Sequence, residues 1–164
     1  GLPNGVVTVP LEEANAEHAI LNSVKDVFAP SDVYGVTHLT DADTVLLRGA
    51  VTETLDPASK PIAGDKNSPM QALAWLHTYA TPDGQSEGRS FCTTAGASVD
   101  FVSEDLRRLM VNAMFSLTGH ENEIPAKTNV DFIGKYQPQP FGSHTNTEWS
   151  KKALKPADFG LATQ

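Results

Sequence analysis

The chain has 164 residues, which suits one domain with one hydrophobic core. Apolar residues make up 40% and charged residues 20%, and the 11 prolines and 12 glycines indicate a globular protein with many loops. The formal net charge of −8 argues against nucleic-acid binding, which usually needs a basic face. Cys92 is the single cysteine, so no internal disulfide can form. Cysteine usage therefore does not distinguish an oxidising from a reducing cellular compartment.

No run of about 18 apolar residues occurs, so we expect a soluble chain without a membrane span. The first residue is Gly1 rather than methionine. Either a segment has been removed, or the chain is part of a longer protein.

Strand-forming runs dominate the first half of the chain. Residues 5–10, 32–39 and 43–55 are rich in Val, Leu and Thr, and they predict three strands. A helical turn is predicted within residues 18–24. Residues 56–69 contain Pro, Gly, Asp and Asn, and they predict a loop.

A hairpin and a helix are predicted next. Residues 70–80 and 88–94 predict two antiparallel strands, joined through a turn at 81–84. Apolar side chains then recur at i, i+3, i+4, i+7, i+8 and i+11 from residue 106 to residue 117, which predicts one amphipathic helix. Ser103 is a suitable N-cap.

The chain loses its periodicity beyond residue 120 and becomes rich in Pro, Gly and Asn. We therefore expect a domain over residues 1–120 and an extended tail over residues 121–164 that packs along its surface. The side chains expected to order part of this tail are Phe132, Ile133, Tyr136, Phe141 and Trp149.

Small and hydroxylated residues stand between the second hairpin strand and the helix, in GRSFCTTAGASVD at residues 88–100. Thr93 and Thr94 can donate and accept hydrogen bonds, and Gly96 can adopt a positive φ or let a ligand approach. Free N–H groups near the start of a helix favour an oxygen or an anion. The stretch is either one wall of a polar pocket or only a tight turn that needs small residues.

Several motifs carry a family resemblance. GRSFCTTAGASVDFVSEDLRRLMVNAMFSLTG, followed by IPAKTNVDFIGKYQPQPFG, resembles the C-terminal part of trehalose-utilisation (ThuA-like) domain proteins, most closely the branch of planctomycete-type bacteria. EHAIL, DVYG and GDKNSPMQALAW occur earlier in the family's order. The similarity runs from about residue 15 to about residue 158.

This resemblance implies a flavodoxin-like, three-layer α/β domain related to class I glutamine amidotransferases, incomplete at its N-terminus. It also implies a carbohydrate ligand, a disaccharide or an oxidised 3-keto sugar, in the bacterial cytoplasm or periplasm. The family's opening strand, its Gly-rich turn and its His-bearing loop are absent from this chain. Ala97 stands where many members have His after the glycine, so a role for that His cannot be carried over.

Three residues are candidates for acid–base chemistry. His18 lies in EHAIL, which matches the family's HPI element, and it either acts as acid, base or sugar ligand or caps a short turn. Asp32 and Tyr34 would share one face of a strand and could bind sugar hydroxyls or position a proton. The alternative is that Asp32 is a turn residue and Tyr34 a half-buried edge residue.

Six residues are candidates for sugar binding. Trp75 could stack on a sugar ring or belong to the core. The loop pair before its strand, Lys66 and Asn67, could bind a ligand or could be only exposed loop residues. The full set is Lys66, Asn67, Trp75, Thr93, Thr94 and Gly96.

Other chemistry-bearing residues are expected to be structural. His77 shares a strand face with Trp75. Cys92 lies in an apolar run, so we expect it to be a small buried hydrophobic residue and not a nucleophile. HENE at 120–123 lacks the H-E-x-x-H spacing, and no Gly-rich phosphate loop occurs. We therefore expect neither metal nor cofactor.

The polar residues at the strand ends and the family resemblance together predict a domain that binds a small carbohydrate at the carboxyl edge of its sheet. If the domain is catalytic, the expected chemistry is acid–base hydrolysis or isomerisation of the sugar. The alternative is a non-catalytic binding or interaction module. Its partner would be a second copy of the chain or a missing N-terminal half.

Overall fold

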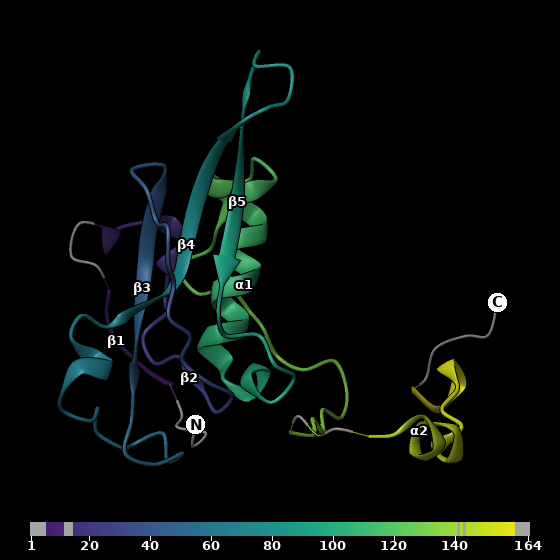
Figure 1. The fold of residues 1–164 in the computed structure, drawn as a ribbon. Coiled ribbons are helices and arrows are strands. Elements are labelled where there is room, and N and C mark those ends of the chain that lie inside the picture. The colour runs from purple at the N-terminus through teal and green to yellow at the C-terminus, as the bar shows by residue number, and fades with distance from the viewer. Residues whose placement is uncertain (1–5, 12–14, 141, 143, 160–164) are drawn as a thin grey trace.

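A five-stranded antiparallel sheet is the main feature of the computed structural model, which describes residues 6–11, 15–140, 142 and 144–159 (Figure 1). The strand order is β2-β1-β3-β4-β5. The strands are β1 (Val6–Leu11), β2 (Phe28–Ala29), β3 (Asp43–Val51), β4 (Gln71–Ala80) and β5 (Glu87–Thr93). The predicted hairpin is confirmed, because β4 and β5 pair antiparallel and Trp75 lies opposite Cys92.

Every pairing among the described strands is antiparallel. A flavodoxin-like domain is instead built around a parallel sheet with helices on both faces. The structure shows a mixed α/β domain, and the flavodoxin-like arrangement stays a prediction.

The amphipathic helix is α1 (Glu104–Leu117), and its predicted cap is confirmed because the Ser103 hydroxyl accepts a hydrogen bond from the Leu106 amide at 3.4 Å. Gly119 follows its C-terminus with φ +83°, a conformation that glycine adopts without strain. The short 3₁₀ helices are η2 (Ala19–Leu21), η3 (Asp65–Asn67), η4 (Asp100–Val102), η5 (Glu121–Glu123) and η6 (Pro156–Phe159). None of the helices in the described ranges has the length and apolarity that crossing a membrane requires.

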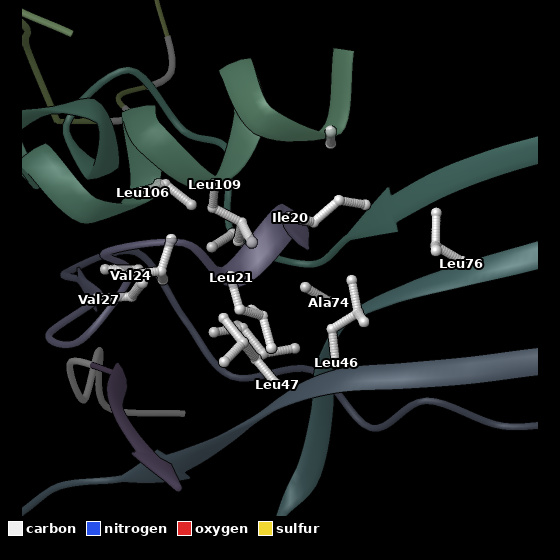
Figure 2. Packing of buried hydrophobic residues seen from close by; sticks show 14 residues of the cluster. Ile20, Leu21, Val24, Val27, Leu46, Leu47, Ala74, Leu76, Leu106 and Leu109 are labelled. Carbon is white, nitrogen blue, oxygen red and sulfur yellow. The ribbon is translucent and has the colours of Figure 1, made fainter. Parts of the chain in front are cut away.

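The hydrophobic core lies where α1 and η2 pack on the sheet (Figure 2). Alternation along β4 sends Ala74 and Leu76 to this inner face, and Leu46 joins them from β3. Leu106 and Leu109 face them from α1, and each such side chain stabilises the fold by about 2 kcal/mol when fully buried.

The strand predicted over residues 32–39 is wrong, because this segment has no regular structure. Two of its backbone amides donate to side chains rather than to a neighbouring strand. The Val33 amide donates to Asp32 Oδ1 at 2.8 Å, and the Val36 amide donates to Gln71 Oε1 at 3.3 Å. Asp32 and Tyr34 therefore do not share a strand face.

The chain after η5 runs back along α1. The Thr128 hydroxyl donates to Asn112 Oδ1 at 2.6 Å, and the Tyr136 hydroxyl donates to the Ser98 carbonyl at 2.6 Å. Ile133, expected to help order the tail, is fully exposed. Phe141 lies outside the described residues.

A short helix, α2 (Asn146–Lys152), was not predicted within the tail. A capping box begins it, with Thr145 as N-cap and Glu148 at the third helical position. Trp149 is half exposed and contacts His144 and Lys152, both within the tail.

Candidate functional site

A buried carboxylate organises the turn between β5 and α1. Asp100 is fully buried, and its Oδ2 accepts hydrogen bonds from the Gly96 and Ala97 amides, both at 2.9 Å. Ser31 donates its amide to Oδ1 at 3.1 Å and its hydroxyl to Oδ2 at 2.8 Å. The amides that were expected to be free for an anion are therefore occupied by the chain's own carboxylate.

Gly96 itself does not need to be glycine for the turn to form. Its φ is not positive, contrary to one expectation, and a Cβ at this position would meet nothing within 4 Å. Its exposure leaves it on the surface of the turn.

The two threonines before the turn behave differently. The Thr93 hydroxyl donates to the Ala95 carbonyl and accepts from the Ala95 amide, both at 3.1 Å, so its capacity is used locally. The Thr94 hydroxyl oxygen is buried and has no hydrogen-bond partner within the part of the chain that the structure describes. Thr94 is thus the one of the pair with hydrogen-bonding capacity to spare.

Residues 25–31 cross the N-terminal end of α1 and are held there by side chains of the helix start. Asp105 Oδ2 accepts from the amides of Lys25 at 2.7 Å and Asp26 at 2.8 Å. The Ser103 hydroxyl also accepts from the Phe28 amide at 3.3 Å. These bonds fix one wall of a groove beside the Asp100 turn.

The groove has a volume of about 760 Å³ and mostly apolar walls. Asp26 is exposed, and its carboxylate has no partner among the described residues. The Arg108 side chain bonds to Glu104 and, with the charge of Lys127, lowers the pKa of that carboxyl. The lining residues are Asp26, Phe28, Pro30, Pro57, Val99, Val102, Ser103, Glu104, Asp105 and Pro138.

The three predicted catalytic residues do not converge on one point. His18 caps η2 by accepting the Ile20 amide at Nδ1, and its Nε2 lies 3.8 Å from an oxygen of Glu121, which follows the end of α1. Asp32 and Tyr34 are exposed and follow Ser31, which is bonded near the start of α1. The 14 residues of α1 span about 21 Å, and His18 is separated from Asp32 and Tyr34 by a distance of this order.

The loop pair lies at the end of β3. The Asn67 side chain donates to the carbonyls of Val51 at 2.9 Å and Ile62 at 2.8 Å, and it accepts the Val51 amide at 2.8 Å. Its amide group is therefore used to attach the loop to the strand, while Lys66 is exposed. Trp75 is half-buried within β4.

Sequence reasoning missed the pairing of Asp43 with His77. Asp43 Oδ1 and His77 Nδ1 lie 2.8 Å apart, and Asp43 also accepts the Thr40 amide at 2.7 Å. The hydrogen bond from the Thr40 backbone, and then the bond from His77, outweigh burial and lower the pKa of Asp43. The two residues are 34 positions apart, so only the register of β3 against β4 reveals the pair.

Within the described ranges, no three His, Cys, Asp or Glu side chains gather to hold a metal ion. Comparison with known proteins adds no family, because no family model, curated protein or solved structure matches the chain.

Proposed function

We propose that the chain is a carbohydrate-binding α/β domain of the ThuA-like type, with a small sugar held in the groove beside the Asp100 turn. The groove carries the proposal, since its volume of about 760 Å³ lies within the usual range of ligand pockets, about 300–1,000 Å³. The motif resemblance supports a disaccharide or a keto-sugar as ligand. It also supports a flavodoxin-like three-layer arrangement for this type of domain.

The groove offers both kinds of contact that a sugar needs. Phe28, Pro30 and Val102 present apolar surface to the C–H face of a pyranose ring. Asp26 offers a carboxylate to its hydroxyl groups, and hydrogen bonds to a charged acceptor are about twice as strong as neutral ones.

Binding rather than turnover is the activity that this geometry favours. General acid–base catalysis needs each group within about 3 Å of the proton that it moves. His18 lies by the far end of α1 from Asp32 and Tyr34, so these three cannot act together on one small sugar without rearrangement. Acid–base chemistry at these residues stays a prediction from the resemblance.

Calorimetric titration with trehalose tests the proposal. We expect saturable binding by the unaltered chain and about tenfold weaker binding by Asp26→Asn, because one charged hydrogen bond is lost. Asp41→Asn is the matched control, since Asp41 is also exposed and lies outside the groove. Absence of binding at millimolar trehalose, or equal affinities for the two variants, would count against the groove as a sugar site.

A second candidate function is an interaction module, favoured by the apolar side chains that the tail exposes. Trp149, Leu154 and Phe159 are each about half exposed or more. Such side chains on one short segment are typical of a contact with another protein. The same titration separates the two functions, because an interaction module would give no heat with trehalose.

A further inference from the structure

The outer face of β4, opposite α1, carries a row of rings. Leu76 belongs to the core beneath α1, so Trp75, His77 and Tyr79 point to the other face by the alternation of a strand. The His77 and Tyr79 rings are nearly parallel, with 14° between their planes and centroids 6.5 Å apart. Figure 1 shows α1 running along the hairpin of β4 and β5.

Asp43 is largely buried while His77 is accessible to solvent, an arrangement that suits proton transfer by the imidazole. The Asp43 side chain is 7% exposed and the His77 side chain 39% exposed, so the carboxylate lies behind the imidazole. The Thr40 amide and hydroxyl fix the same carboxylate at 2.7 and 3.0 Å. A carboxylate held in this way keeps the proton of His77 on Nδ1 and leaves Nε2 as an open acceptor.

Two residues of β5 lie opposite the ring-bearing residues of β4. Ser90 of β5 lies opposite His77 on the same face and adds a hydroxyl. Gly88 lies opposite Tyr79, and a Cβ there would come within 2.4 Å of the Tyr79 ring, so the ring lies across β5 where no side chain projects.

We propose that Asp43 and His77 form a proton-transfer site for ester hydrolysis, with the ring-bearing part of the ester packed against Tyr79. His77 Nε2 takes a proton from a water molecule, whose oxygen bonds to the acyl carbon. The bond from that carbon to the leaving oxygen breaks, and the imidazolium returns its proton to the leaving oxygen. Asp43 is a positioning residue that keeps its bond to Nδ1 throughout. This site is separate from the groove and does not depend on the sugar proposal.

The chain contains a matched control for this site. His120 Nδ1 lies 2.8 Å from an oxygen of Glu123, the same distance as in the His77–Asp43 pair. Both partners are exposed there, at 55% and 68%, and they are neighbours on one short turn. An exposed carboxylate in water orients and stabilises an imidazolium far less than a buried one.

The first test measures hydrolysis of p-nitrophenyl acetate by the full chain and its variants. We expect His77→Gln to lower kcat/KM about 100-fold, the usual contribution of general-base catalysis. His120→Gln should change kcat/KM less than about twofold, because its imidazole is positioned by solvent-exposed groups only. Equal effects of the two substitutions would overturn the proposal, as would a rate in the unaltered chain no higher than that of free imidazole.

The second test follows the tautomer of His77 by its ¹⁵N chemical shifts at neutral pH. We expect the Nδ1–H form in the unaltered chain and a mixture of tautomers in Asp43→Asn. We also expect a kcat about tenfold lower for Asp43→Asn at an unchanged KM, because the base is then mispositioned while the ester still binds. A changed tautomer with an unchanged kcat would overturn the role of the pair. This variant keeps the proposal testable if His77→Gln fails to fold.

Discussion

At Asp100, four hydrogen bonds converge on a side chain without access to solvent. The donors come from two segments, Ser31 on one side and the turn at Gly96 and Ala97 on the other. The acceptor is buried and its donors are partly buried, so losing the carboxylate leaves N–H and O–H groups with little access to water. One carboxylate therefore fixes both segments that border the groove.

Asp100→Asn tests this at the scale of one residue. The NH₂ group of the new Asn side chain would face at least one N–H donor, and two donors cannot form a hydrogen bond. We therefore expect the free energy of unfolding, measured by urea denaturation, to fall by about 2 kcal/mol. Asp131→Asn is the control, because Asp131 is exposed and should change stability by less than about 0.5 kcal/mol. Equal midpoints for the two variants would contradict a structural role for the buried carboxylate.

The hairpin of β4 and β5 separates two environments at the scale of one element. Its inner face packs on α1 through Leu76 and Phe91, while its outer face carries the row that includes His77 and Tyr79. Strand alternation alone assigns each side chain to its face. Gly88 is a position of the hairpin where a side chain would collide with a neighbouring ring, that of Tyr79.

Gly88→Ala tests that dependence. The new methyl group would displace the Tyr79 ring, which is 45% exposed and can rotate away, so we expect stability to change by less than about 1 kcal/mol. The contact of Tyr79 with residue 88 in nuclear Overhauser spectra should disappear. Gly96→Ala is the control, because open space surrounds that position and no contact should change. An unchanged Tyr79 contact in Gly88→Ala would contradict the close approach of ring and strand.

Local signals predicted some elements and not others. The helix α1 was predictable because its apolar stripe and the Ser103 cap agree, and the hairpin because a turn signal separates two apolar runs. Residues 32–39 have strand-forming side chains, but contacts with Asp32 and Gln71 override that propensity. The helix α2 had a visible signal, the Thr145–Glu148 capping box, which the loss of periodicity obscured.

The candidate sites depend on long-range contacts that no motif reveals. The turn of small residues pointed to the right neighbourhood, yet the Asp100 carboxylate that occupies its amides was not foreseen. Ser31 reaches Asp100 across 69 positions of sequence, and Asp43 reaches His77 across 34. Such pairs follow from strand register and core packing, which a single sequence does not specify.

Acidic groups with lowered pKa values are spread over the whole molecule. They occur in β3, in the hairpin turn, in α1 and in α2, and in each case hydrogen bonds favour the ionised form: Asp43, Asp83, Glu104 and Glu148. These carboxyls bind protons more weakly in the folded chain than in the unfolded chain, so unfolding takes up protons in acid. Their contribution to stability is fully present above the ordinary pKa values, 3.8 for Asp and 4.5 for Glu.

We therefore expect the free energy of unfolding to be level from pH 7 to about pH 5, and to fall as the pH drops through the lowered pKa values below about pH 4. Urea denaturation at a series of pH values measures this profile. Asp43→Asn combined with Glu104→Gln should make the fall in unfolding free energy below about pH 4 less steep, because the double variant lacks two of the carboxyls that lose their charge there. The net charge of −8 acts in the opposite direction, since protonation relieves repulsion among the acids. Stability that rises steadily from pH 5 to pH 3 would show that this repulsion outweighs the hydrogen-bonded carboxylates.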